Sequence, residues 1–164
     1  MKRCRRARPG SSTPLRRATM FKKILLPTDG SELSLFATRA AVGLAKSQGA
    51  HIVGVYVIDP FPYIGIGDAS AIGLQAYLTE AKAAAGVALD AARMACAADG
   101  VPFAGDTIER NVVYEGIIET AEAEGCDLIV MGSHGRQGVK ALILGSVAQK
   151  VLTHAKVPVL IVKS

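Results

Sequence analysis

The sequence of 164 residues lacks tryptophan, is poor in other aromatic residues and contains no long apolar run. No apolar stretch reaches the roughly 20 residues that a transmembrane helix needs, which argues against a membrane span. With aromatic residues at only 5%, a function based on stacking nucleic-acid bases is disfavoured. The three cysteines, Cys4, Cys96 and Cys126, form no C-x-x-C pair. Their scatter argues against a disulfide framework or a zinc site and favours a reducing cytosol.

The net charge of +5 is concentrated at the start of the chain. The sequence has 19 basic and 14 acidic residues, and the first 19 residues hold seven of the basic ones and no acidic one. The rest therefore carries a net charge of −2, without a nucleic-acid footprint. Residues 1–19 lack apolar periodicity, so we predict a disordered basic extension. A targeting segment, a nucleic-acid arm and translation from an upstream start are the alternatives. We favour the last, because Met20 stands directly before the first predicted strand.

Strands and helices alternate after Met20. Apolar and β-branched runs predict strands at 24–27, 51–58, 103–109, 128–131 and 159–162. Helical spacing of apolar residues predicts helices between Ser31 and Gly49, over 74–98, over 115–124, and from Ser146 onward. A Pro- and Gly-rich loop is expected at 59–73. The alternation predicts an α/β fold in which a single doubly wound domain, residues 20–164, contains a five-stranded parallel sheet covered on both faces. We take the strand order to be 3-2-1-4-5.

A glycine pattern follows the fourth predicted strand. The stretch from Met131 to Ser146, MGSHGRQGVKALILGS, has the form G-x2-G-x9-G-S and ends at the start of a predicted helix. Glycine lets the backbone approach phosphate oxygens and adopt positive φ. The helix start offers free N–H groups and the positive end of the helix dipole, and Ser146 is a natural N-cap. A linker with helix caps is the alternative, but the long fixed spacing favours nucleotide binding.

The predicted strand order places a second loop beside this one. In doubly wound sheets, ligands bind at the carboxyl ends of strands where the order reverses. Thr28 and Asp29 end the first strand and Gly132 ends the fourth, so both loops would flank the same crevice. The sequence contains no Gly-Lys-Ser/Thr, which excludes a Walker A loop. Residues 65–67 begin a G-x-G pattern without the third glycine, and we interpret them as an ordinary connecting loop rather than a flap.

Catalytic groups are hard to find near these loops. Hydrolysis of a nucleotide would need a base or a positioned water, together with cations. His134, Arg136 and Lys140 are the nearby candidates, and each fits binding or solvent exposure better. Asp29 could hold Mg²⁺ through water, although an aspartate at a strand end more often bonds a sugar or caps a turn. The histidines show no metal-ligand spacing. We therefore expect no catalytic residue, no metal ligand and little or no turnover.

Together these motifs resemble the universal stress protein family of the nucleotide-binding type. The resemblance covers about residues 20–163, and the glycine signature matches without a gap. It rests on four stretches: 23–31, 55–59, 126–148 and 157–162. One departure is the stretch 111–113, Asn-Val-Val, where many members have a Gly and a Pro before the third helix. Asn can also adopt positive φ there. The family's fold is Rossmann-like, of the adenine nucleotide alpha-hydrolase-like type.

The resemblance implies a site for ATP, with or without Mg²⁺, in a cytoplasmic homodimer that acts in stress response or signalling. The dimer would often form by pairing of the final strands, and no nucleic acid or membrane partner is implied. By position, Asp29 would lie near the ribose and the backbone of Val57 would contact adenine. The amides of Gly132, Gly135, Ser146 and Val147 would hold phosphates. The other implied site residues are Pro27, Thr28, Met131, Ser133, His134, Arg136, Gln137, Gly138 and Gly145.

Two other functions stay open at this stage. An ATP-hydrolysing or adenylyl-transferring enzyme of a related fold should carry a Ser-Gly-Gly-type loop after the first strand, where this chain has Thr28-Asp29-Gly30-Ser31. A dimeric interaction module without nucleotide would not need the glycine pattern, which is intact.

Overall fold

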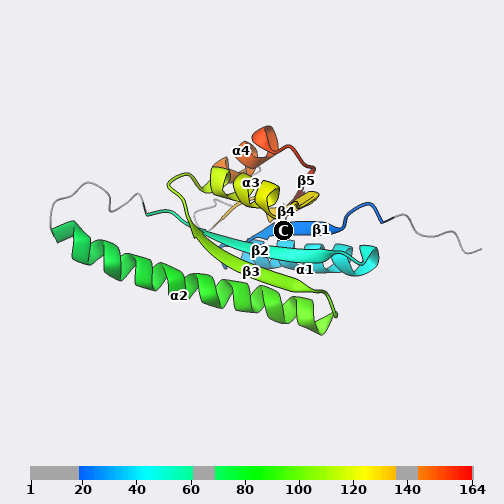
Figure 1. Ribbon diagram of the computed structural model, residues 1–164, viewed down its shortest axis with the longest axis horizontal. Coiled ribbons are helices and arrows are strands. Elements are labelled where there is room, and N and C mark those ends of the chain that lie inside the picture. The colour runs from blue at the N-terminus through cyan, green and yellow to red at the C-terminus, as the bar shows by residue number, and fades with distance from the viewer. Residues whose placement is uncertain (1–18, 61–68, 136–143, 164) are drawn as a thin grey trace, which may run out of the picture.

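The five predicted strands form one parallel sheet. The computed structural model describes residues 19–60, 69–135 and 144–163. The sheet order is β3-β2-β1-β4-β5, which confirms the predicted topology (Figure 1). Each strand lies within one residue of its predicted bounds at either end. The strands are β1 (Lys23–Pro27), β2 (His51–Ile58), β3 (Phe103–Glu109), β4 (Leu128–Gly132) and β5 (Val159–Val162).

In the described ranges, four helices cover the two faces of the sheet (Figure 1). One layer holds α1 (Glu32–Gln48) and α2 (Ala69–Ala98), and the other holds α3 (Val113–Ala123) and α4 (Ser146–His154). Ser31 caps the start of α1, because its side chain accepts a hydrogen bond from the N–H of Ser34. The helix ends at Gly49, whose φ of 67° favours glycine.

Two helices begin earlier than predicted. The helix α2 starts at Ala69 rather than at 74, so part of the expected loop is helical. Gly73 was a reason to expect a loop there, but a single glycine only weakens a helix. The helix α3 starts at Val113 rather than at 115, and Val112 occupies its cap without a side-chain hydrogen bond. The beginning of α3 therefore rests on packing rather than on a capping signal that the sequence would reveal.

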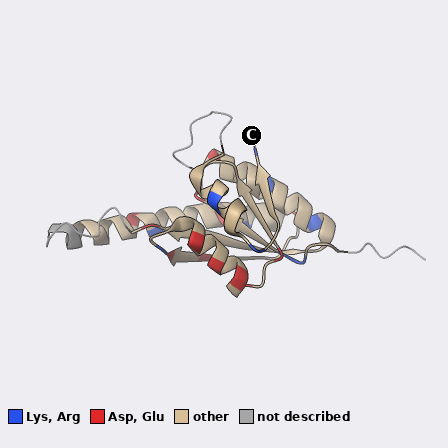
Figure 2. Cartoon of the chain, turned by 90° about the horizontal axis from the view of Figure 1, so that it is seen from above, with Lys and Arg blue, Asp and Glu red and all other residues tan. Residues whose placement is uncertain are grey.

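The central strand β1 is buried on both faces. Ile24 and Leu26 belong to the core beneath α1 and α2, whereas Leu25 belongs to the core beneath α3 and α4. Successive side chains of a strand point to opposite faces, so a strand covered on both sides is apolar throughout. In Figure 2 the strands are mostly uncharged, and β2, β4 and β5 contain no Lys, Arg, Asp or Glu.

Two cysteines act as small core residues. Cys96 and Cys126 are buried free thiols. Burial raises the pKa of each thiol to about 11, so neither is a reactive thiolate at neutral pH. Within the described part of the chain, no helix is long and apolar enough to cross a membrane.

Removal of residues 1–19 should leave the stability of the domain unchanged. Among the described residues, every member of the three hydrophobic core clusters lies at position 21 or beyond. The predicted extension itself lies outside the described residues, apart from its last residue. A version of the protein that begins at Met20 should therefore melt at the same temperature as the full chain. A loss of several degrees in thermal unfolding would show that the extension contributes to the fold.

Candidate functional site

A cleft of about 920 Å³ lies at the carboxyl ends of β1, β2 and β4. Its walls come from α2, from α3 and from the start of α4. This is the edge where doubly wound sheets bind ligands, and the volume suits a small molecule. Eleven of the implied site residues line it: Pro27, Thr28, Asp29, Val57, Met131, Gly132, His134, Gly135, Gly145, Ser146 and Val147.

Four implied residues are absent from this lining. Arg136, Gln137 and Gly138 lie outside the described residues. Ser133 is only 5% exposed, and its Oγ lies 3.1 Å from Nδ1 of His134. Ser133 thus orients the imidazole of His134, which does line the cleft, although Ser133 itself is buried and does not line it.

The turn after β1 holds Asp29 in place. The N–H of Thr28 donates to the carbonyl of Val55 at 2.9 Å, which keeps the chain beside β2. Oδ1 of Asp29 accepts the N–H of Ser31 at 3.0 Å, and Oγ1 of Thr28 accepts the N–H of Gly30 at 3.3 Å. Gly30 has a φ of 76°, a conformation that favours glycine. The carboxylate of Asp29 is therefore fixed at the base of the cleft.

The two ends of the glycine loop are joined by the backbone. The N–H of Gly145 donates to the carbonyl of Ser133 at 2.8 Å, and the N–H of Ser133 donates to the carbonyl of Val162 at 2.9 Å. Gly145, in an extended conformation, occupies the N-cap of α4, so the prediction that Ser146 is the cap was wrong by one residue. The bond to Ser133 positions Gly145 so that the helix begins directly after it.

The first turn of α4 opens into the cleft. Ser146, Val147 and Ala148 all line it. The first N–H groups of a helix have no partner within the helix, and they carry the positive end of the helix dipole. This wall of the cleft therefore offers backbone donors suited to an anion.

The glycines of the loop are explained by how closely their backbone approaches neighbouring oxygen atoms, and not by positive φ. None of Gly132, Gly135 and Gly145 has a positive φ, so the prediction of that conformation was wrong for these three. A Cβ on Gly132 would lie 3.2 Å from the carbonyl oxygen of Leu33. On Gly145 it would lie 3.0 Å from the Ser133 carbonyl oxygen, and on Gly135 only 2.8 Å from Oδ2 of Asp29. The three glycines let the backbone pack against these oxygens.

The end of β2 presents a donor and an acceptor to the cleft. Hydrogen bonds of a parallel strand alternate in direction, and Val55 bonds toward β1 through its carbonyl. The N–H and C=O of Val57, two residues further on, point to the same side. Pairing of β1 with β2 stops at Pro27 opposite Val55, so these groups face the space beyond the end of β1.

The wall formed by α2 was not predicted from the sequence. Tyr77, Glu80, Ala81 and Ala84 line the cleft, and Oη of Tyr77 donates to the carbonyl of Asp59 at 2.9 Å. These residues follow β2 by about twenty positions and match no motif. The described residues contain no cluster of three or more His, Cys, Asp or Glu side chains that could hold a metal ion.

Comparison with known proteins decides the family. The profile of the Universal stress protein family matches residues 20–163. The chain belongs to this family. A universal stress protein of Methanocaldococcus jannaschii, MJ0531, is 37% identical over 145 residues, which cover 88% of this chain and 83% of that protein.

Two solved structures extend the comparison within the universal stress proteins and their structural relatives. The structure of the protein MJ0577 has a TM-score of 0.73 at 29% identity and covers 88% of this chain and 97% of its own. The structure of a universal stress protein from Archaeoglobus fulgidus in complex with dAMP has a TM-score of 0.60 at 20% identity. It covers 87% of this chain and 98% of its own, and at that identity it supports the fold.

Proposed function

We propose that the cleft binds ATP and that the protein is a dimeric nucleotide-binding module of stress response or signalling, with little or no turnover. The observation that carries this proposal is the first turn of α4, which faces the same cleft as the backbone of Val57. One end of the cleft suits phosphates and the other suits a base. The dAMP complex of the Archaeoglobus fulgidus protein is consistent with an adenine nucleotide in this fold.

The phosphates would lie against the glycine loop and α4. Backbone N–H groups at Gly132, Gly135, Ser146 and Val147 would donate to phosphate oxygens, as anion sites at helix starts do. Asp29 is close to this end, because its Oδ2 lies 2.8 Å from the position of a Cβ on Gly135. A carboxylate there favours ribose hydroxyls as partners, or a Mg²⁺ ion held through water. Titrations with and without Mg²⁺ would separate these two roles.

The backbone N–H and C=O of Val57 would recognise the base through hydrogen bonds. Adenine presents an amino donor beside a ring-nitrogen acceptor, which match the C=O and the N–H of one residue. Guanine presents an oxygen acceptor and an N–H donor at the corresponding places, so the same pair is mismatched. Val113 and Ile117 of α3 provide an apolar wall for the ring. Calorimetric titration should therefore show ATP binding more tightly than GTP by about tenfold or more, the worth of roughly one hydrogen bond.

Turnover of bound ATP should be far slower than binding. The described cleft contains one histidine, His134, and its Nδ1 is engaged by Ser133. Of the carboxylates that line the cleft, Asp29 is the one beside the glycine loop, and its Oδ1 accepts the N–H of Ser31. We assign it to binding rather than to the activation of water. Purified protein with Mg-ATP should release phosphate far below the enzyme median of about 10 s⁻¹. A rate near that median would favour a nucleotide-hydrolysing enzyme instead.

The homodimer would form along β5. Within the described sheet this strand pairs only with β4 and forms an edge, and Leu160 on it is 42% exposed. Pairing of two β5 strands would satisfy the free edge and cover this leucine. Light scattering should give twice the chain mass for the native protein and a monomer for Leu160→Lys. The matched control Leu35→Lys, at an exposed leucine of α1, should remain dimeric. A dimer that persists in Leu160→Lys would place the interface elsewhere.

A further inference from the structure

The approach of α3 to the strand ends depends on Gly116. This residue is buried in α3, and it faces side chains of β2 and β3. A Cβ on Gly116 would lie 3.1 Å from Cγ of Arg110, 3.1 Å from Cδ1 of Ile108 and 3.2 Å from Cγ1 of Val57. Each distance is shorter than ordinary van der Waals contact. A methyl group at this position would therefore have to displace at least one of three neighbours, or α3 itself.

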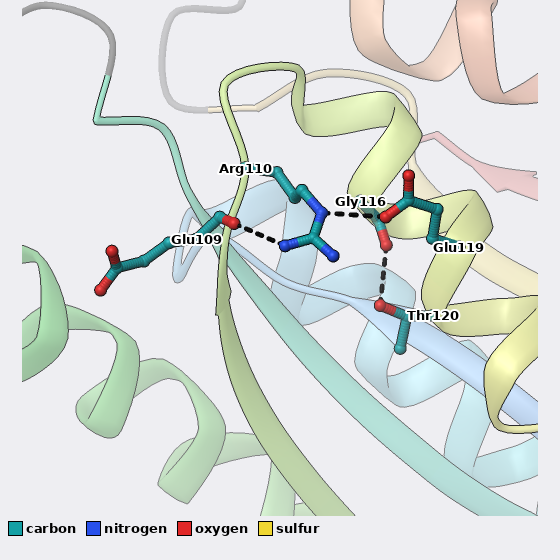
Figure 3. A network of polar contacts seen from close by, with 5 residues as sticks. All are labelled: Glu109, Arg110, Gly116, Glu119 and Thr120. Carbon is teal, nitrogen blue, oxygen red and sulfur yellow. Dashed lines mark hydrogen bonds and ion pairs between the residues drawn. The ribbon is translucent and has the colours of Figure 1, made fainter. Parts of the chain in front are cut away.

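Arg110, one of these neighbours, is held by one backbone and two side-chain hydrogen bonds, and Figure 3 shows the two side-chain bonds. The backbone N–H of Arg110 donates to the carbonyl of Ile58 at 2.9 Å. Its Nη1 donates to the carbonyl of Glu109 and its Nε to Oε2 of Glu119 on α3, both at 2.9 Å. Each side-chain bond is exposed and weak by itself. Together they fix the side chain across Gly116 and tie α3 to the end of β3.

Val57, another neighbour of Gly116, lies at the end of the cleft that is proposed to hold the nucleotide base. Val57 supplies the backbone pair that faces the ligand, and its side chain packs toward α3. Val113 and Ile117 lie in the same helix as Gly116, and they line the cleft together with Val57. The gap between the apolar wall of α3 and the backbone of Val57 is thus set by how closely α3 packs at Gly116.

We propose that Gly116 is a specificity-determining position for the base, because it sets the width of the slot between Val57 and the α3 wall. The inference rests on the proposed nucleotide function of the cleft. It assigns base selection to a residue that touches no ligand and acts through Val57, Val113 and Ile117. A glycine inside a helix weakens the helix, and here the close packing of α3 on β2 offsets that cost.

The test is Gly116→Ala, with Gly43→Ala as the matched control. Both glycines lie inside helices, but a Cβ on Gly43 meets nothing within 4 Å. Calorimetry with ATP, GTP and inorganic tripolyphosphate separates base recognition from phosphate recognition. In Gly116→Ala, ATP affinity and the ATP-to-GTP ratio should each fall by about tenfold, the effect of moderate overpacking, while tripolyphosphate affinity stays unchanged. Gly43→Ala should match the native protein for all three ligands.

Arg110→Ala provides a second variant in case Gly116→Ala does not fold. This substitution removes the side chain that ties α3 to the end of β3. The ion pair that is lost with it, to Glu119, is exposed, so the fold should persist. The ATP-to-GTP ratio should fall while tripolyphosphate binding is retained. An unchanged ratio in a folded variant, or an equal loss for ATP and tripolyphosphate, would overturn the inference. Failure of the native protein to bind ATP would instead refute the proposed function.

Discussion

The variant Gly135→Val should lose detectable ATP binding while remaining folded. A Cβ on Gly135 would lie 2.8 Å from Oδ2 of Asp29, and the branched side chain would extend into the space beside it. Asp29 cannot retreat freely, because its other oxygen accepts the N–H of Ser31. The loop must therefore move, and the amides lose their alignment with the phosphates. Each charge-assisted hydrogen bond to a phosphate contributes about 1.5–3 kcal/mol, so the absence of a few of them removes measurable affinity.

One control variant and two further measurements are needed to interpret this result. Gly43→Val introduces the same side chain at an exposed position with nothing within 4 Å, and its ATP affinity should match that of the native protein. Circular dichroism should show Gly135→Val folded, and light scattering should show it still dimeric, since β5 is separate from the loop. Native affinity in a folded Gly135→Val variant would mean that the glycine pattern serves only the backbone, and nucleotide binding would have to be abandoned.

The variant Gly145→Val should lose ATP binding and also some stability. Its Cβ would lie 3.0 Å from the carbonyl oxygen of Ser133 and 3.3 Å from Cα of His134, and both neighbours are backbone atoms. The same Ser133 oxygen accepts the N–H of Gly145. Relief of the clash would shift the start of α4, whose first turn forms the anion wall. Overpacking of this kind typically costs about 1–3 kcal/mol, which chemical unfolding would measure.

The outcome for Gly145→Val also distinguishes two roles of the loop. Loss of both ATP binding and stability would indicate that Gly145 positions the start of α4 and, through it, the phosphate site. A variant that is destabilised but binds ATP with native affinity would show that the start of α4 does not contact the ligand. The proposed phosphate site would then have to be placed elsewhere in the cleft.

The fold was predictable because its signals are local. The run Ile24–Leu26 is apolar without alternation, as a central strand buried on both faces must be. The extended bounds of α2 and α3 were not predictable, because propensity is a weak guide near helix ends and packing decides there. Handedness and connection rules limit the possible strand orders without selecting one. The order 3-2-1-4-5 was a hypothesis, which the structure confirms.

The candidate site was only partly accessible from the sequence. The glycine pattern and the turn at Asp29 are contiguous in the chain and could be found by spacing. The reason for Gly135, by contrast, is the approach of Asp29, more than a hundred residues away in the sequence. Tyr77 of α2 and Gly116 of α3 belong to no motif, and only the packed structure brings Tyr77 to the cleft and Gly116 against Val57. The position of the α4 cap shifted by one residue because a backbone bond to Ser133 outweighs the capping preference of serine.

Native mass spectrometry tests the central proposal most directly. The protein would be analysed as purified and after addition of ATP, alongside Gly135→Val and Gly43→Val. The proposal predicts one adenine nucleotide per chain in the native protein and in Gly43→Val, and none in Gly135→Val. A native protein that carries no nucleotide even with ATP in excess would contradict the proposal and favour an interaction module whose cleft binds no nucleotide.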